Sequence, residues 1–222
     1  TSVIYNAARE PEIVDLQALL RSMGARVNGA GGSIITVEGG AALHGCTHRV
    51  IGDRIVCATY LCAAAAAGGE VRLTGVDYRA VSTVALSLAE SGCEIRSEAD
   101  AVSLRSHGAL RSVRPVRTAP YPGFPTDAQP VLMAALLRSE GCTVFFENIF
   151  ENRYRHVDEL SRMGAEIRVA GRVAVVNGVR TLHGAAVKCT DLRGVAALVI
   201  AGLSAEGTTR VTELTHIDRG YD

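Results

Sequence analysis

The chain has 222 residues, of which 48% are hydrophobic and 21% are charged, and its 23 Lys and Arg residues balance 23 Asp and Glu residues. The length suits one large domain or two small ones. A formal net charge of zero argues against a protein that binds nucleic acid through bulk positive charge, so we expect no nucleic-acid partner. The longest apolar run, 56–67, is shorter than the ~20 residues that span a bilayer, and no signal-peptide pattern opens the sequence, so we expect no membrane partner.

The six cysteines form no Cys-x-x-Cys pair, and most of them lie in apolar runs. We therefore expect free, mostly buried thiols in a reducing compartment. The six histidines lack the spacing of metal ligands, so the sequence predicts no metal site, and it indicates no cofactor.

The first helix in chain order is predicted to begin near Pro11, because proline suits a first helical turn. Its apolar residues recur on one helical face; they are Ile13, Leu16, Leu20 and Met23. The run 34–37 follows as a predicted strand. The glycine-rich stretch 29–32 lacks the lysine of a phosphate-binding loop and lies between two strands, so it predicts a turn.

A repeated unit organises the rest of the chain. An aspartate precedes an alanine- and leucine-rich helix three times: Asp53 before 55–67, Asp127 before 128–137 and Asp191 before 195–203. A second helix in each unit carries Leu, three residues, Gly, two residues, then Val or Ile; the copies are Leu20/Gly24/Val27, Leu88/Gly92/Ile95 and Leu160/Gly164/Ile167. With strands between the helices and a β pair at the end, this period of about 70 residues predicts an α/β fold built from βαβαββ units.

The chain begins and ends inside a unit, so it holds a half unit, two whole units and another half. We therefore expect a fragment of a longer protein whose partner is the missing N-terminal part of the same chain. Residues 1–51 are then expected to leave an apolar face uncovered.

The stretch Pro122-Gly123-Phe124-Pro125-Thr126-Asp127 is predicted to be a rigid turn that presents one carboxylate. Because an apolar helix follows, Asp127 is expected to be its N-cap or a first-turn residue. Arginines recur near such carboxylates: Arg54 and Arg193 in first helical turns, Arg153 and Arg219 after strands.

Helix N-termini attract anions, and arginines bind phosphates and carboxylates in pairs of hydrogen bonds. If the helix starts converge, the sequence predicts an anion-binding cleft in which Asp127 and Asp191 act as a base or a charge-stabilising group. The alternative is a set of surface ion pairs worth ~0–1 kcal/mol each.

Five motifs carry a resemblance to a known family. They are Asn6-Ala7-Ala8-Arg9-Glu10-Pro11-Glu12, Pro122-Gly123-Phe124-Pro125-Thr126-Asp127, Ile149-Phe150-Glu151-Asn152-Arg153, Thr190-Asp191-Leu192-Arg193 and His216-Ile217-Asp218-Arg219-Gly220-Tyr221. The sequence resembles, along its whole length, the UDP-N-acetylglucosamine 1-carboxyvinyltransferase family of enolpyruvyl transferases.

The resemblance implies an enolpyruvyl-transferase-like inside-out α/β barrel of repeated βαβαββ units, a fragment of a two-domain protein. Residues 1–51 would be the C-terminal piece of the first domain and residues 52–222 most of the second. The implied reaction is cytoplasmic and begins peptidoglycan synthesis: the enolpyruvyl group of phosphoenolpyruvate moves to the 3-hydroxyl of UDP-N-acetylglucosamine and phosphate is released. Those two small molecules are the implied substrates.

The resemblance also assigns roles by position. Asp127 would contact the sugar 3-hydroxyl as the general base, Asp191 would stabilise charge at the reacting carbon, and Ile149 would contact the UDP-sugar through its backbone. The cationic side chains would bind the phosphate and carboxylate groups or line the cleft; these are Arg54, Arg153, Arg193 and Arg219.

The sequence departs from the family pattern at Val56 and Ala58, where the family usually has Glu and Gly. The family's Lys-Asn pair and reactive-cysteine loop have no counterpart among residues 1–222, so the isolated chain is expected to be inactive or nearly so. Two alternatives stay open: a related enolpyruvyl transferase with another acceptor, and a non-catalytic UDP-sugar-binding module.

Overall fold

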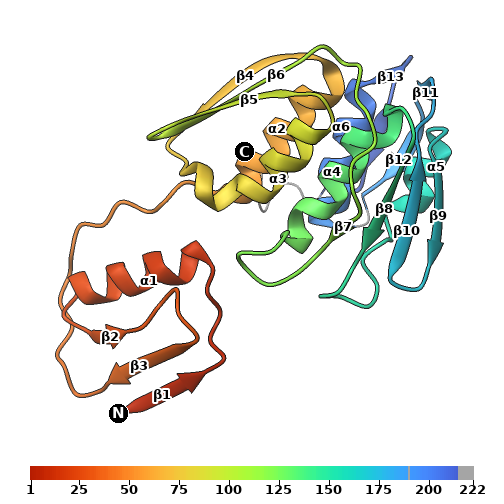
Figure 1. Cartoon of the computed structure of the whole chain (residues 1–222). Helices are drawn as coiled ribbons and strands as arrows, with labels where there is room; N and C mark the ends of the chain where they lie inside the picture. The colour runs from red at the N-terminus through yellow and green to blue at the C-terminus, as the bar shows by residue number, and fades with distance from the viewer. Residues whose placement is uncertain (190, 215–222) are drawn as a thin grey trace. The chain divides into compact units, whose positions relative to one another are not determined.

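A computed structural model describes residues 1–189 and 191–214 (Figure 1). The chain divides into two compact units. The first comprises Thr1–Gly52 with Pro120–Pro122, and the second comprises Asp53–Ala119 with Gly123–Asp222.

The first unit contains one helix and one three-stranded antiparallel sheet. Its elements are β1 (Ser2–Tyr5), α1 (Pro11–Ser22), β2 (Arg26–Asn28) and β3 (Ile34–Glu38), and the strand order is β1-β3-β2. The predicted turn lies between β2 and β3, where Gly29 has φ +95 and an added Cβ would lie 2.1 Å from the carbonyl oxygen of Ile34. Pro11 is at the first position of α1, as predicted.

Many apolar side chains of the first unit remain accessible, although Val27 and Ile35 are buried. No residue of α1 is buried, and Val3, Ile4 and Tyr5 of β1 are exposed together with Leu16. The predicted uncovered apolar face is therefore confirmed.

Three inner helices form the centre of the second unit. They are α2 (Arg54–Ala67), α4 (Gln129–Ala135) and α6 (Leu192–Leu203), and each packs against the other two. Two 3-10 turns flank α4, η1 (Thr126–Ala128) and η2 (Leu136–Arg138). Fully buried leucines fill this centre; they include Leu61, Leu132, Leu136 and Leu198.

Sheets and two outer helices surround the inner helices of the second unit (Figure 1). One sheet has the order β4-β6-β5 and another β7-β8-β10-β9, and two parallel pairs join β11 to β13 and β12 to β14. The strands are β4 (Gly69–Thr74), β5 (Glu94–Glu98), β6 (Ala101–Ser106), β7 (Val116–Arg117), β8 (Cys142–Phe146), β9 (Glu166–Ala170), β10 (Val173–Asn177), β11 (Leu182–His183), β12 (Ala186–Lys188), β13 (Ala205–Glu206) and β14 (Arg210–Thr212). The outer helices are α3 (Tyr78–Glu90) and α5 (Val157–Arg162).

The predicted repeat is visible at the helix ends. Three copies of strand, helix and β-hairpin share one strand order, with the last strand in the middle: β1-β3-β2, β4-β6-β5 and β8-β10-β9. After each helix a glycine takes a positive φ and the next N–H bonds back to a leucine carbonyl, as in a Schellman stop. The glycines are Gly24, Gly92 and Gly164, and the bonds are Ala25 to Leu20 (2.9 Å), Cys93 to Leu88 (3.0 Å) and Ala165 to Leu160 (3.2 Å).

One whole βαβαββ unit runs from β7 to β10, as predicted. The unit that contains α2 differs, because residues 39–53 form no strand and its opening strand is missing from the described chain. That segment is mostly exposed and pairs with none of the described strands, so the prediction of two whole units was wrong for this copy. In the last copy the strands are split into short parallel pairs around α6.

The six cysteines are free thiols, four of them buried and two, Cys46 and Cys142, exposed. Burial raises the pKa of Cys57 to about 12, so this thiol is a packing group rather than a nucleophile. None of the helices in the described residues is long and apolar enough to cross a membrane.

Candidate active site

Asp127 lies in the first turn of η1, at the entrance to α4. Its side chain accepts no capping hydrogen bond at η1 or at α4, so the first-turn position is confirmed and the N-cap alternative is wrong. The carboxylate is held instead by two guanidinium groups, which outcompete a single neutral N–H as partners.

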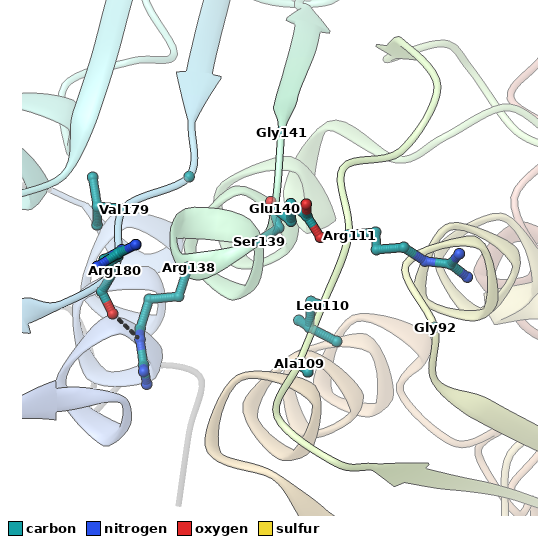
Figure 2. A pocket seen from close by; sticks show the side chains of 11 residues that line it. Gly92, Ala109, Leu110, Arg111, Arg138, Ser139, Glu140, Gly141, Val179 and Arg180 are labelled. Atoms are coloured by element: carbon teal, nitrogen blue, oxygen red, sulfur yellow. Dashed lines mark hydrogen bonds between the residues drawn. The ribbon is translucent and has the colours of Figure 1, made fainter.

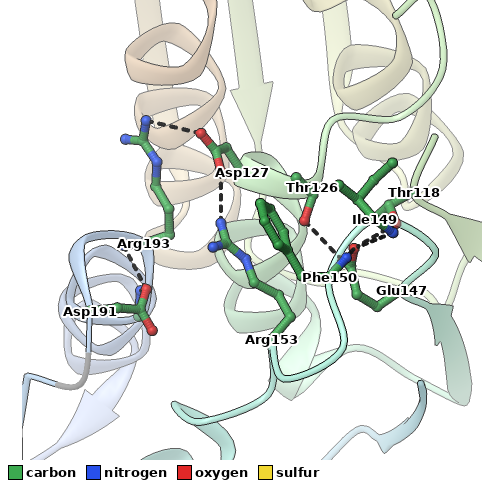
Figure 3. Close-up of polar contacts among 10 residues, drawn as sticks. Thr118, Thr126, Asp127, Glu147, Ile149, Phe150, Arg153, Asp191 and Arg193 are labelled. Carbon is green, nitrogen blue, oxygen red and sulfur yellow. Dashed lines mark hydrogen bonds and ion pairs between the residues drawn. The ribbon is translucent and has the colours of Figure 1, made fainter. Parts of the chain in front are cut away.

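Two arginines from separate segments converge on Asp127 (Figure 3). Nη2 of Arg153 lies 2.7 Å from Oδ1 of Asp127, and Nη2 of Arg193 lies 3.3 Å from Oδ2 of Asp127. The side chain of Asp127 is 40% exposed, whereas both arginine side chains are only 16% exposed. The group therefore presents a partly open carboxylate backed by two shielded positive charges.

Asp191 and Arg193 form the start of α6. Asp191 Oδ1 accepts the N–H groups of Arg193 (3.0 Å) and Gly194 (2.9 Å), so it is the N-cap of the helix that it was predicted to precede. Asp53 caps α2 in the same way through the N–H groups of Ile55 (2.7 Å) and Val56 (3.0 Å). The cap at Asp191 fixes the first turn from which Arg193 reaches Asp127.

Glu147 is a site residue that the sequence analysis missed. Its side chain is 1% exposed and follows β8, next to the carboxyl end of the parallel strand β7. It accepts hydrogen bonds from the hydroxyls of Thr118 and Thr126 (both 3.0 Å) and from the N–H groups of Ile149 (2.9 Å) and Phe150 (3.0 Å). A glutamate directly after the apolar strand 142–146 was the signal that could have revealed it.

The loop after Glu147 carries Ile149 and Phe150, which are 38% and 49% exposed. The N–H of Ile149 donates to Glu147, so its carbonyl oxygen is the backbone atom left for a ligand. The guanidinium carbon of Arg153 lies 5.4 Å from the centre of the Phe150 ring, in cation–π range. The loop thereby brings an exposed backbone edge and a site arginine together.

His156 lies behind this loop and is fully buried. Burial lowers its pKa to about 4, Asp191 raises it in part, and the charge of Arg153 lowers it further. Neither ring nitrogen has a partner in hydrogen-bonding geometry, and the same holds for the buried Nε of Arg153. His156 is therefore a neutral imidazole near Asp191 and Arg153.

Of the other predicted site residues, the structure describes Arg54 but not Arg219. Arg54 is the first residue of α2, and α2 packs against η1. Arg219 lies outside the described residues, as does Thr190. The described chain contains no group of His, Cys, Asp and Glu side chains suited to a metal ion.

A separate cavity of about 830 Å³ lies at the other end of the α4 segment, where η2 ends (Figure 2). Arg138 lines it and donates to the carbonyl oxygens of Arg180 (3.3 Å) and Ser204 (3.2 Å). Arg138 thus satisfies carbonyl groups near a helix end, and no predicted site residue lines the cavity.

The arrangement at Asp127 suits acid–base chemistry on an anionic ligand. A carboxylate within reach of a hydroxyl can remove its proton, and the two arginines can bind phosphate or carboxylate oxygens. An anion that binds Arg153 and Arg193 would compete with Asp127 for them and so release the carboxylate towards a hydroxyl.

Inner helices surrounded by repeated sheets are also found in solved enolpyruvyl transferases. The enolpyruvyl transferase NikO from Streptomyces tendae superposes with a TM-score of 0.86 at 27% identity, over 99% of this chain and 53% of NikO. EPSP synthase from Acinetobacter baumannii shares the fold, with a TM-score of 0.68 at 21% identity, over 90% of this chain and 50% of that one. The predicted enolpyruvyl-transferase-like fold is confirmed.

The family model described as EPSP synthase (3-phosphoshikimate 1-carboxyvinyltransferase) matches residues 1–222, so the chain belongs to this family. A UDP-N-acetylglucosamine 1-carboxyvinyltransferase of Gluconacetobacter diazotrophicus is 52% identical over 99% of this chain and 52% of its own length. Another, of Zymomonas mobilis, is 50% identical over the whole chain and 52% of its own length. The chain spans about half the length of the curated relatives it matches.

Proposed function

We propose that this chain forms part of an enzyme that transfers the enolpyruvyl group of phosphoenolpyruvate to the 3-hydroxyl of UDP-N-acetylglucosamine and releases phosphate. The observation that carries the proposal is the ion-paired group of Asp127, Arg153 and Arg193, drawn from three separate segments. The names of relatives that are about half identical to the chain support the choice of substrates.

In the proposed mechanism, Arg153 and Arg193 bind the anionic groups of phosphoenolpyruvate. Asp127, released from the arginines, removes the proton of the sugar 3-hydroxyl as its oxygen bonds to carbon 2 of phosphoenolpyruvate. Asp191 stabilises charge at that carbon. Carbon 3 of phosphoenolpyruvate gains a proton in this addition step. In the elimination step phosphate leaves carbon 2 and carbon 3 loses a proton, which restores the enolpyruvyl double bond.

Further residues complete the proposed site. The carbonyl oxygen of Ile149 accepts a hydrogen bond from the UDP-sugar, because its N–H is already used by Glu147. Arg54 lines the site and Arg219 binds the anionic groups. The group that donates a proton to carbon 3 of phosphoenolpyruvate belongs to the part of the enzyme outside residues 1–222. The isolated chain is therefore inactive or nearly so.

The wider assignment follows from this reaction. Residues 1–51 belong to one enolpyruvyl-transferase domain and residues 52–222 to a second, and the missing N-terminal part is their partner. The enzyme acts in the bacterial cytoplasm at the first committed step of peptidoglycan synthesis, and thus in cell-wall biogenesis, cell shape, the cell cycle and division.

A related enolpyruvyl transferase with another acceptor is the second candidate, because Val56 and Ala58 depart from the family pattern. The departures Val56 and Ala58 lie in the first turns of α2, where Ala58 is buried in the core. A non-catalytic UDP-sugar-binding module would keep the binding step and lack the transfer.

Phosphate release tests the proposal once the chain is joined to the half of the Gluconacetobacter diazotrophicus relative that it does not match. We expect release that needs both substrates and falls at least about a hundredfold in Asp127→Asn. Release with shikimate 3-phosphate in place of UDP-N-acetylglucosamine would support another acceptor, and binding without release would support the binding module.

A further inference from the structure

Glu147 is a buried carboxylate to which the proposed mechanism gives no step. All four of its hydrogen-bond partners are donors, and three of them point at Oε1 while Thr126 points at Oε2. No basic side chain of the described residues forms an ion pair with it. Burying a carboxylate without a cation is costly unless its oxygens are hydrogen-bonded, and here each oxygen accepts at least one hydrogen bond.

Three of the four donors belong to the two segments that carry the ion pair of Asp127 and Arg153 (Figure 3). Thr126 directly precedes Asp127, and the N–H groups of Ile149 and Phe150 belong to the loop that leads to Arg153. One carboxylate therefore joins the turn that presents Asp127 to the loop that presents Arg153.

The end of strand β7 supplies a third segment that binds Glu147. Thr118 follows β7, and its hydroxyl donates to Glu147 while it accepts the N–H of Asn148 at 2.8 Å. The Asn148 side chain returns a bond of 3.0 Å to the Thr118 carbonyl oxygen. Glu147 is thus held by the ends of two parallel strands, which are rigid supports for a site.

We propose that Glu147 is a positioning residue that sets the separation of Asp127 and Arg153 and thereby the affinity for the UDP-sugar. The identity of the ligand, the UDP-sugar, rests on the proposed function. The positioning of the two segments rests on the hydrogen bonds of Glu147 alone. Asp127 and Arg153 are 26 residues apart and meet at 2.7 Å. A small shift of either segment would lengthen that contact, and such misplacement lowers binding and rate steeply.

The bonding pattern predicts a graded response to substitution. In Glu147→Gln the amide oxygen keeps its three donors, and the amide N–H₂ faces a Thr126 hydroxyl that can accept as well as donate. Glu147→Ala removes all four bonds. Thr126→Val removes only the link to the Asp127 turn and keeps the shape of the side chain.

The experiment uses the full chain and two kinds of readout. NMR of the Arg153 Nε–H group and hydrogen exchange of the Ile149 and Phe150 amides report the positions of the segments without any substrate. Calorimetry with UDP-N-acetylglucosamine reports affinity. Glu166→Ala is the matched control, because the side chain of Glu166 is exposed and its hydrogen bond goes to the side chain of Asn177, away from Glu147.

We expect Glu147→Gln and Glu166→Ala to behave like the original chain. Glu147→Ala should speed exchange of both amides, free the rotation of the Arg153 guanidinium and weaken binding about tenfold or more. Thr126→Val should alter the Arg153 signal while the two loop amides stay protected. This variant decides the matter if Glu147→Ala does not fold.

An unchanged Arg153 signal in both Glu147→Ala and Thr126→Val would overturn the inference, even with a lowered melting temperature. The Arg153 signal also decides the inference when the original chain binds no UDP-N-acetylglucosamine. The absence of UDP-N-acetylglucosamine binding would count against the proposed function and not against the positioning role of Glu147.

Discussion

Asp127 and Arg193 are 66 residues apart in the sequence, yet Oδ2 of Asp127 lies 3.3 Å from Nη2 of Arg193. The first belongs to the turn before α4 and the second to the first turn of α6, and these two helices pack together in the core. The repeat thus places equivalent helix starts side by side, and one aspartate joins them to the loop of Arg153.

Asp127→Asn should strengthen the binding of inorganic phosphate to the chain. The carboxylate now neutralises part of the charge of Arg153 and Arg193, so its loss leaves more of that positive charge to attract an anion. We expect an affinity gain of about tenfold, because a charged hydrogen bond contributes ~1.5 kcal/mol. Calorimetry measures it, with Asp100→Asn on an exposed turn as the control; weaker phosphate binding in Asp127→Asn would contradict the competition.

Thr118→Val should destabilise the second unit. The valine keeps the shape but removes a hydroxyl that donates to Glu147 and accepts from Asn148. The free energy of unfolding should fall by about 1–3 kcal/mol, the cost of leaving buried partners unsatisfied. Urea denaturation measures this loss. Thr118→Ser keeps the hydroxyl and should retain most of the stability; equal losses in the two variants would show that the methyl group matters and the hydrogen bonds do not.

Gly178→Ala should be poorly tolerated. A Cβ at this position would lie 1.5 Å from the carbonyl oxygen of Ser139, so the backbone of one segment has to move. We expect a loss of about 3 kcal/mol or more, at the upper end of overpacking effects. In contrast, Gly171→Ala meets no atom within 4 Å and should cost only about 1–2 kcal/mol, for its positive φ. Thermal unfolding of both variants compares them, and a smaller loss in Gly178→Ala would contradict the close approach.

The stability of the chain should depend on His156 in mildly acidic solution. Burial lowers the pKa of His156 from 6.5 to about 4, so the unfolded chain binds more protons in that interval. The free energy of unfolding is therefore highest above about pH 6.5 and falls as the pH decreases towards about 4, by up to about 3 kcal/mol.

His156→Phe removes this contribution and should flatten the profile between about pH 6.5 and about pH 4. Denaturant unfolding at several pH values measures it, with exposed His107→Gln as the control. A profile in His156→Phe as steep as in the original chain would assign the acid sensitivity to the carboxylates instead.

The sequence predicted the repeated elements because their signals are local. Glycine stops after the helices, β-branched strands and aspartate caps each act within a few residues, which is why the helices at Asp53 and Asp191 begin where predicted. The missing strand in 39–53 shows the limit: a strand exists only when a partner pairs with it, and pairing is not a local property.

The site was predicted in part for the same reason. Asp127, Arg153 and Arg193 stand out as charged residues next to repeated motifs, and the structure brings them together. Glu147 carries no motif of its own. Its importance comes from four partners in three segments, and only the folded chain shows that they meet.

The group around Asp127 is proposed to bind the UDP-sugar. Calorimetric titration of this chain with UDP-N-acetylglucosamine, beside Asp127→Ala and the exposed control Asp100→Ala, tests it most directly. We expect binding that Asp127→Ala weakens at least about tenfold, as for the loss of a charged hydrogen bond, and that Asp100→Ala leaves unchanged. Binding of equal strength in all three proteins would place the sugar elsewhere and contradict the claim.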